Sequence, residues 1–174
     1  MVDLTIEVFC NMKKVPELET ERLTLRGITE ADTQVVVNLR SNPDVYKYFI
    51  APHKITPQEH MTWYENSYLL NENRIDWMAF DKNANFVGIF GVKRDSQDSS
   101  EAEVSYILSP EQYKKGYSTE AVERLIQFCR DNWHCVFVTA EIHEDNIDSI
   151  HFVKKLGFAQ KGKNGFFATF VREC

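Results

Sequence analysis

Alternating apolar and polar positions predict most of the strands in this chain. Leu23 and Leu25 alternate with charged neighbours, which is typical of a half-buried strand that begins near residue 19. A nearly continuous apolar run at residues 135–142 has the pattern of a strand buried on both faces. The other predicted strands are a hairpin of residues 74–81 and 84–93, followed by 101–108 and 165–171.

Apolar residues at helical spacing predict about four helices. The first begins after the N-cap Thr29, and the second begins at Thr56-Pro57. The third follows the loop that contains Gly116 and has apolar residues at helical spacing from Ala121 to Trp133. Ile150, Val153 and Leu156 mark a short fourth helix, and Gly157 suits the left-handed position at its end. Because the third helix lies between two predicted strands, we expect it to cross over between parallel neighbours.

Composition favours one folded domain. The 174 residues are 43% hydrophobic with only 7 Gly and 5 Pro, which is enough apolar material for a real core. No Ser/Gly-rich linker or internal repeat divides the chain. We therefore predict a mixed α/β domain at residues 19–174, preceded at residues 1–18 by an extension or an edge strand.

Charge and hydropathy restrict the partners. A net charge of -6 argues against nucleic acid, because phosphate backbones need clustered Lys and Arg. No apolar run approaches the length of a membrane span, and the first ten residues carry acids rather than a basic secretory segment. These patterns predict a cytoplasmic protein without membrane or nucleic acid partners.

The cysteines do not indicate a metal or redox site. Cys10, Cys129, Cys135 and Cys174 show neither C-x-x-C spacing nor an adjacent histidine pattern. We expect reduced thiols that serve mostly in packing, and no bound metal.

A strand, a basic loop with a glycine and a helix start follow one another at residues 106–121. The first N–H groups of a helix lack intrahelical partners, and the helix dipole adds positive charge, so this order forms an anion cradle. Gly116 permits close approach of the backbone, Lys114 and Lys115 attract a polyanion, and Ser118 is small. The loop therefore predicts a phosphorylated ligand.

Three segments in this order resemble the GNAT superfamily of acyl-CoA N-acyltransferases, and within it the ribosomal-protein-alanine acetyltransferases. They are residues 20–26 (TERLTLR), 115–121 (KGYSTEA) and 146–158 (NIDSIHFVKKLGF). The resemblance extends from about residue 19 to residue 172. It implies a single GNAT-like domain with a twisted, mostly antiparallel sheet of six to seven strands, one splayed parallel pair and about four helices.

The resemblance also implies acetyl-CoA as the acyl donor. Its pyrophosphate would lie on backbone N–H groups of the basic loop, and its pantetheine arm would pair with the strand before the loop and meet a polar residue on the last helix. The implied cofactor-binding residues are Tyr106, Ile107, Leu108, Tyr113, Lys114, Lys115, Gly116, Tyr117, Ser118, Asn146 and Ser149. Ser149 has an alternative role in capping or buttressing the last helix. The loop departs from the family pattern, which opens with Gln or Arg and ends with Gly or Ala, at Tyr113 and Ser118.

Acetyl transfer to an amine needs a group that accepts the amine proton. Superfamily members often place a carboxylate on the strand before the loop, where this chain has Glu103, and Glu101 shares its face. Many relatives carry a tyrosine that protonates the leaving thiolate, but this chain has Val153 there. Tyr106, Tyr117 or solvent would then supply that proton.

The early helices and the hairpin should select the acceptor. Their aromatic residues either line a pocket or belong to the core: Tyr46, Tyr48, Phe49, Trp63, Tyr64 and Trp77. Because an acidic chain has no special reason to approach a ribosome, we predict a small-molecule primary amine as acceptor. Residues 59–64 resemble amino-sugar acetyltransferases, which makes an amino sugar one candidate. The alternatives are acetylation of a protein N-terminus and a non-catalytic acyl-CoA-binding module. We expect a monomer or a homodimer.

Overall fold

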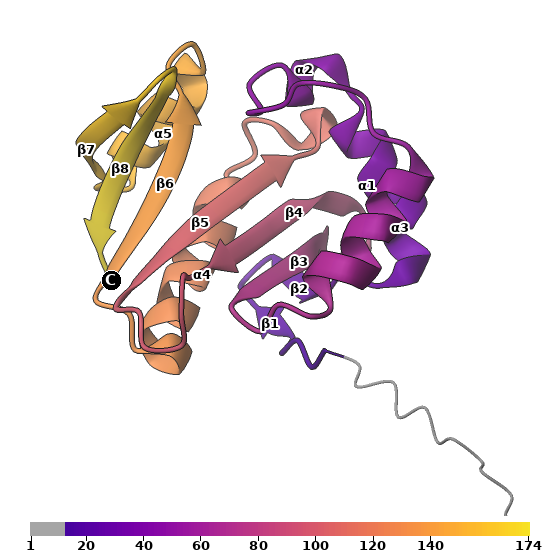
Figure 1. Ribbon diagram of the computed structural model, residues 1–174, viewed down its shortest axis with the longest axis horizontal. Coiled ribbons are helices and arrows are strands. Elements are labelled where there is room, and N and C mark those ends of the chain that lie inside the picture. The colour runs from indigo at the N-terminus through magenta and orange to yellow at the C-terminus, as the bar shows by residue number, and fades with distance from the viewer. Residues whose placement is uncertain (1–12) are drawn as a thin grey trace, which may run out of the picture.

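A computed structural model describes residues 13–174, so the alternating N-terminal residues Leu4, Ile6 and Val8 and the cysteine Cys10 lie outside the described part. One eight-stranded sheet dominates this part, with the order β1-β2-β3-β4-β5-β6-β8-β7 (Figure 1). Its strands are β1 (Leu18–Glu19), β2 (Leu23–Gly27), β3 (Arg74–Asp81), β4 (Phe86–Lys93), β5 (Glu101–Leu108), β6 (Phe137–His143), β7 (Ala159–Asn164) and β8 (Phe167–Glu173).

Five α-helices accompany the sheet in the described chain. They are α1 (Thr33–Arg40), α2 (Pro43–Tyr46), α3 (Pro57–Trp63), α4 (Tyr117–Trp133) and α5 (Ile147–Lys155). Short 3-10 turns lie at Glu30–Asp32 and Pro110–Gln112, and a π-helical turn at Tyr64–Tyr68 extends α3. The mixed α/β architecture with one parallel pair is the fold that the sequence predicts.

The helices cover opposite faces of the sheet. Leu125 and Phe128 of α4 pack with Trp77 and Phe90 in the larger core cluster. On the other face, Val36 of α1 belongs to a smaller cluster with residues of β3 and β4. Figure 1 shows α4 behind the sheet and α1 to α3 in front of its first strands. The molecule is therefore a sheet between two helical layers.

The local start and stop signals operate as the sequence indicates. Thr56 accepts the Glu59 N–H through its side chain, while the Glu59 carboxylate accepts the Thr56 N–H, so a reciprocal capping box begins α3. Thr29 and Asp32 form the same motif at the turn before α1. Gly157 has a φ of 86°, the left-handed conformation predicted after α5.

The structure has two more strands than the periodicity alone reveals. β7 is exposed along its entire length and contains no apolar residue beyond Ala159, so no alternation marks it. It forms because β8 offers an unpaired edge, and the two strands pair from Ala159 to Asn164. β1 is only two residues long, too short for a periodic pattern. The extra helix α2 begins at Pro43, where the sequence indicates only the end of α1.

The parallel pair positions the site. β5 and β6 pair only at Glu101–Glu103 with Phe137–Thr139. Beyond that, β5 continues along β4 to Leu108, whereas β6 continues along β8 to His143. Figure 1 shows the two strands diverging toward the end where α2 lies. Among residues 13–174, the edge of β5 that faces β6 therefore has no strand partner past Glu103.

Candidate active site

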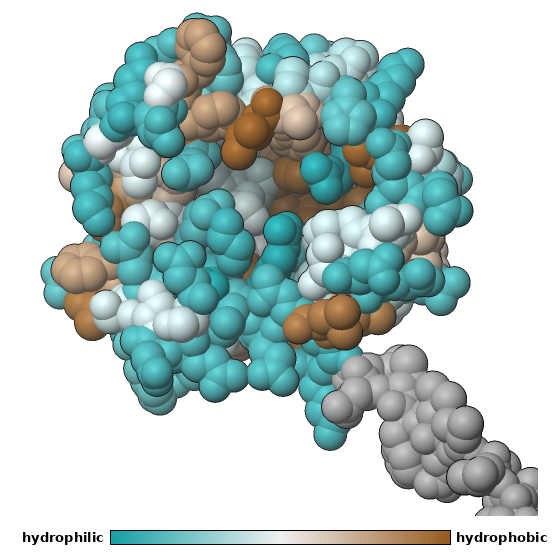
Figure 2. Space-filling view, viewed as in Figure 1, coloured by the Kyte–Doolittle hydropathy of each residue, from teal (hydrophilic) through white to brown (hydrophobic). Residues whose placement is uncertain are grey.

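The diverging strands open into a cleft of about 1300 Å³. β5 and β6 form its walls, and the first turns of α4 and α5 and the segment after α1 complete it. Figure 2 shows it as a hollow in one face of the molecule, with apolar and polar side chains around it. All the predicted site residues line this cleft except Lys115.

The basic loop arrives at α4 in a conformation that leaves its backbone open. Lys114 and Gly116 have φ values of 63° and 81°, and Gly116 is the N-cap of α4. Because Gly116 has no Cβ, the first N–H groups of α4 remain approachable from the cleft, where Ser118 and Thr119 lie. Lys115 instead turns its ammonium to the Gln112 side chain, 2.9 Å away. Its charge acts on the cleft only at longer range.

A clasp from the N-terminal segment holds this loop. The Glu120 carboxylate, in the first turn of α4, accepts hydrogen bonds from the Thr20 hydroxyl and from the Arg22 N–H and Nε. Arg22 Nη1 donates to the Lys115 carbonyl oxygen at 2.9 Å, and its guanidinium lies 4.8 Å from the centre of the Tyr117 ring. These contacts assign a structural role to the TER segment that the sequence only marked as a resemblance.

We expect Glu120→Gln to weaken acetyl-CoA binding by about 3- to 10-fold, because a loop that is no longer held must be ordered when the ligand binds. Calorimetry measures this change directly. The matched control is Glu123→Gln. Glu123 lies on the same helix as Glu120 but away from the loop, and it pairs with Arg172 of β8. Equal affinity in both variants and the unmodified protein would contradict a positioning role for the clasp.

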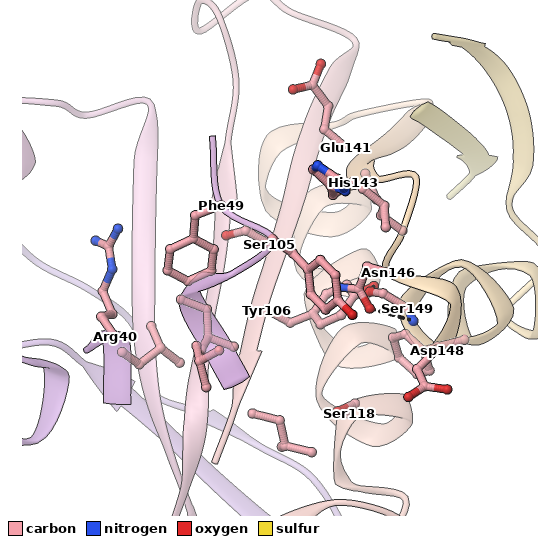
Figure 3. A pocket seen from close by; sticks show the side chains of 18 of the residues that line it. Arg40, Phe49, Ser105, Tyr106, Ser118, Glu141, His143, Asn146, Asp148 and Ser149 are labelled. Carbon is pink, nitrogen blue, oxygen red and sulfur yellow. Dashed lines mark hydrogen bonds between the residues drawn. The ribbon is translucent and has the colours of Figure 1, made fainter. Parts of the chain in front are cut away.

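Tyr106 spans the gap between the diverging strand and α5. Its hydroxyl points to Ser149 (Figure 3), with 2.5 Å between the two side-chain oxygens. Its ring packs edge-on against Phe152. Burial raises the pKa of Tyr106 to about 12, against the opposing effect of the Ser149 hydrogen bond. The hydroxyl therefore keeps its proton at neutral pH. Val153, where many relatives carry tyrosine, is fully buried in the core.

Asn146 and Ser149 begin α5 beside the cleft. Asn146 is the N-cap, and its Oδ1 accepts the Ser149 N–H at 3.3 Å. Its oxygen is thus used in capping, while its amide NH₂ has no recorded partner in the described chain and is available to a ligand. Ser149 receives the Asn146 cap through its N–H and contacts Tyr106 through its hydroxyl, which is the buttressing alternative considered for it. Its role in cofactor binding stays a prediction.

Glu103 faces the opposite side of the sheet from α4. Ala102 and Val104 are buried in the core beneath α4, so the intervening Glu103 points to the face that carries α1 and α3. Its carboxylate lies 3.2 Å from Lys93 Nζ, and about a third of its side chain is exposed (34%). Glu101 pairs with Lys161 instead and does not line the cleft. Of the two acids, Glu103 is the one in the site.

The cleft has a polar floor, formed by Arg74, Asp76 and Ser105, that sequence reasoning missed. Arg74 Nε donates to Asp76 Oδ2 at 2.6 Å, and Asp76 is buried. A Cβ on Gly91 would lie 2.3 Å from Asp76 Oδ1 and 2.9 Å from Ser105 Oγ, so only glycine leaves room for both side chains there. Two glycines inside one predicted strand, Gly88 and Gly91, were the available signal of close contacts.

The predicted aromatic residues divide between cleft and core. Tyr48, Phe49 and Trp63 line the cleft, whereas Trp77 is fully buried and donates Nε1–H to the Pro16 carbonyl. The Tyr48 ring lies 5.9 Å from the ring of His143 at the end of β6. The segment after α2 thus reaches across the opening between the diverging strands.

The described residues show neither a metal site nor a membrane span. Between residues 13 and 174, no group of three or more His, Cys, Asp or Glu side chains is arranged to hold a metal ion. No helix in that range is long and apolar enough to cross a membrane. Cys129 and Cys135 are buried free thiols, and burial raises the pKa of both.

A family model for the acetyltransferase (GNAT) domain matches residues 22–159. Among curated proteins, the chain is 27% identical over 152 residues to the uncharacterized N-acetyltransferase p20 of Bacillus licheniformis, covering 83% of each chain. It is 25% identical over 150 residues to the uncharacterized N-acetyltransferase YoaA of Bacillus subtilis, covering 84% of this chain and 85% of YoaA.

Solved structures share the fold. A spermidine N-acetyltransferase from Vibrio cholerae, in complex with CoA and spermine, superimposes with a TM-score of 0.78 at 19% identity, covering 87% of this chain and 95% of that one. A domain from Methanocaldococcus jannaschii has a TM-score of 0.77 at 24% identity, covering 90% and 100% of the two chains. At these identities the likeness concerns the architecture.

Proposed function

The chain belongs to the acetyltransferase (GNAT) domain family and is an N-acetyltransferase, and from this premise we propose that it transfers the acetyl group of acetyl-CoA to a primary amine of a small molecule. One observation carries the proposal: the unpaired edge of β5 and the open N-terminus of α4 lie in the same cleft. Together they match the extended arm and the pyrophosphate of an acyl-CoA.

The donor would bind mainly through backbone groups. Main-chain N–H groups from Tyr113 to Ser118 would hold the pyrophosphate, with Lys114 beside it. The unpaired edge at Tyr106, Ile107 and Leu108 would pair with the pantetheine arm as an added strand, and the Asn146 amide would donate to it. Because main-chain contacts predominate, the departures at Tyr113 and Ser118 are compatible with binding.

The reaction needs two proton transfers, for which the cleft has two groups on β5. The amine nitrogen attacks the thioester carbon, a C–N bond forms, and the carbonyl oxygen becomes an oxyanion. Glu103 accepts the amine proton, directly or through water. Collapse of the oxyanion breaks the C–S bond, and Tyr106 gives its proton to the sulfur and regains one through Ser149 and solvent. Tyr117 is less suitable because its ring lies under Arg22.

We expect Tyr106→Phe to lower kcat by about 10-fold, because a thiolate is a tolerable leaving group even without a positioned acid. The affinity for acetyl-CoA should stay within about 2-fold, since the main-chain contacts remain. Steady-state kinetics with Tyr117→Phe as control separates the two tyrosines. A larger loss in Tyr117→Phe would transfer the acid role to that residue.

An amine of limited size suits this cleft, because aromatic side chains narrow it. The rings of Tyr48 and His143 lie 5.9 Å apart beside the diverging strands, and residues of α1 to α3 line the other side. We therefore keep a small-molecule acceptor, with an amino sugar as one candidate. The ribosomal-protein-alanine resemblance, a monomeric or homodimeric state and a cytoplasmic location remain predictions.

The test combines binding and turnover. Acetyl-CoA is titrated calorimetrically into the purified chain, and release of free CoA thiol is then followed with amino sugars, amino acids, polyamines and N-terminal peptides. Turnover of a small amine supports the proposal, and selective turnover of peptides would instead favour protein N-terminal acetylation. Binding without turnover of any amine would identify a non-catalytic acyl-CoA module, whereas absence of binding would refute the donor site.

A further inference from the structure

Arg40, the last residue of α1, has no ion-pair partner among the described residues. No carboxylate of residues 13–174 lies within ion-pairing distance of its guanidinium, and its buried Nε has no hydrogen-bond partner there. Its guanidinium carbon lies 5.4 Å from the centre of the Phe49 ring (Figure 3). A half-buried cation without an anion beside it costs free energy. An anion bound next to Arg40 would therefore be stabilised.

His60, on α3, is a second polar group without a partner. Its side chain is almost completely buried (2% exposed), yet neither ring nitrogen has a hydrogen bond in the described chain. The ring lies 5.5 Å from that of Trp63. Burial lowers the pKa of His60, and the Arg40 charge lowers it further, so the imidazole is neutral and keeps one N–H to donate.

Both residues line a small side pocket of about 160 Å³, together with His53, Ile55, Glu59 and Trp63. Arg40, His53 and Trp63 also line the main cleft, so the two spaces adjoin. The volume accommodates one compact polar group. A buried imidazole and an unpaired guanidinium beside such a space are donors without acceptors.

The acids near this pocket are already engaged. Glu59 accepts the Thr56 N–H and hydroxyl in the capping box and lies 3.7 Å from His53 Nε2. Asp76 attracts Arg40 from a distance but is hydrogen-bonded to Arg74. Asp32, which acts electrostatically on His60, is paired with Arg26. Because each nearby carboxylate has its own partners, the positive charge of Arg40 is left over at this end of the cleft.

We infer that the acceptor amine carries an anionic oxygen group, a carboxylate or a phosphate, which binds Arg40 and His60 at the side pocket. This inference rests on the proposed function and specifies its substrate class. Guanidinium and imidazole N–H groups are suitable donors for such an oxyanion, because charge-assisted hydrogen bonds are the strongest available.

The polar floor leads from this pocket toward the reacting groups. Arg74 lies near enough to both Arg40 and Glu103 to interact electrostatically with each, and Asp76 and Ser105 meet over Gly91. An acceptor with its anion at Arg40 would therefore extend along this floor with its amine toward Glu103. A polycation such as spermidine would instead place a positive charge beside Arg40.

The experiment compares amines in matched pairs that differ in the anionic group. Suitable pairs are glucosamine 6-phosphate with glucosamine, O-phosphoethanolamine with ethanolamine, tyrosine with tyramine, and 4-aminobutanoate with 1,4-diaminobutane. Acetyl transfer is measured as kcat/KM at fixed, saturating acetyl-CoA. We expect the anionic member of the accepted pairs to be preferred by about 10-fold or more. The phosphate and carboxylate pairs distinguish the two sources of the oxyanion.

Substitution of Arg40 provides the second arm. Arg40→Gln should raise KM for the anionic acceptor by about 10- to 100-fold with a smaller change in kcat, because the contact exists before and during the reaction. Arg40→Lys should restore part of the affinity, since it retains charge without the planar fork. The control is Arg130→Gln, an exposed residue that pairs with its neighbour Asp131.

His60→Phe gives a readout that does not depend on turnover. It keeps an aromatic ring beside Trp63 and removes two buried, unpaired nitrogens, so thermal stability of the free protein should rise while KM for the anionic acceptor increases. A stability loss would show that His60 is satisfied by the protein itself and would count against the site.

The outcomes separate this inference from the proposed function. Preference for anionic amines that is lost in Arg40→Gln supports both. Turnover of neutral or polycationic amines with equal or greater efficiency overturns the anionic acceptor and leaves the N-acetyltransferase proposal standing. Absence of transfer to any amine, despite acetyl-CoA binding, overturns the proposed reaction and the acceptor class with it.

Discussion

Replacement of Gly116 by valine should weaken acetyl-CoA binding by at least about 100-fold, because a β-branched residue does not tolerate a φ of 81° and adds atoms where the pyrophosphate would approach the backbone. A Cβ at this position would also lie 3.3 Å from Arg22 Nη2, within the clasp that holds the loop. Isothermal calorimetry measures the loss, and thermal unfolding shows whether the variant is folded.

Gly157→Val is the matched control for this variant. Gly157 has nearly the same backbone conformation, with a φ of 86°, but nothing lies within 4 Å of its added Cβ. Both substitutions should cost about 1–3 kcal/mol of stability through backbone strain. Only Gly116→Val should also lose acetyl-CoA. If both variants bind acetyl-CoA equally well, the pyrophosphate does not lie on this loop.

Conversion of Glu103 to glutamine should reduce kcat by about 100- to 10,000-fold, because the amide is nearly isosteric but cannot accept the amine proton. The affinity for acetyl-CoA should be unchanged, since none of the proposed donor contacts involves this side chain. Pre-steady-state measurement of acetyl transfer, with binding followed separately, distinguishes lost chemistry from lost binding.

Glu101→Gln is the companion variant. Glu101 lies two residues earlier on the same face of β5, pairs with Lys161, and does not line the cleft. Its kcat should stay within about 2-fold of the unmodified enzyme, since exposed ion pairs contribute little. If Glu103→Gln keeps the kcat of the unmodified enzyme, solvent removes the proton. A large loss of kcat in Glu101→Gln would assign the role to Glu101.

Much of the donor side of the site could be predicted because its residues are close in sequence. The strand, loop and helix start at residues 106–121 are continuous, and a helix N-terminus presents its N–H groups whatever surrounds it. Gly116 in the left-handed region and Asn146 at the start of α5 follow from the same local rules. Lys115 is the exception, because its contact with Gln112 depends on the shape of the loop.

The acceptor side was less accessible to sequence reasoning. The aromatic segments at residues 42–50 and 60–68 indicated a pocket, yet no pattern separated cleft residues from core residues. Trp77 is entirely buried, while Phe49 and Trp63 reach the cleft. Which aromatic residues line the cleft depends on how α1 and α3 pack on the sheet. The local periodicity of the sequence does not predict that packing.

The sequence by itself determined the α/β class, the order of the main elements, the crossover helix and the glycine-containing loop that precedes it, because these depend on side-chain periods and on backbone preferences of single residues. Tertiary structure alone decided where β5 and β6 diverge and that the Glu120 carboxylate accepts hydrogen bonds from Arg22. It also decided that Arg40 and His60 lie beside one pocket without a hydrogen-bond partner for Arg40 Nε or the His60 ring in the described part of the chain. Those features require groups far apart in the chain to meet, and only the packing of the whole domain brings them together.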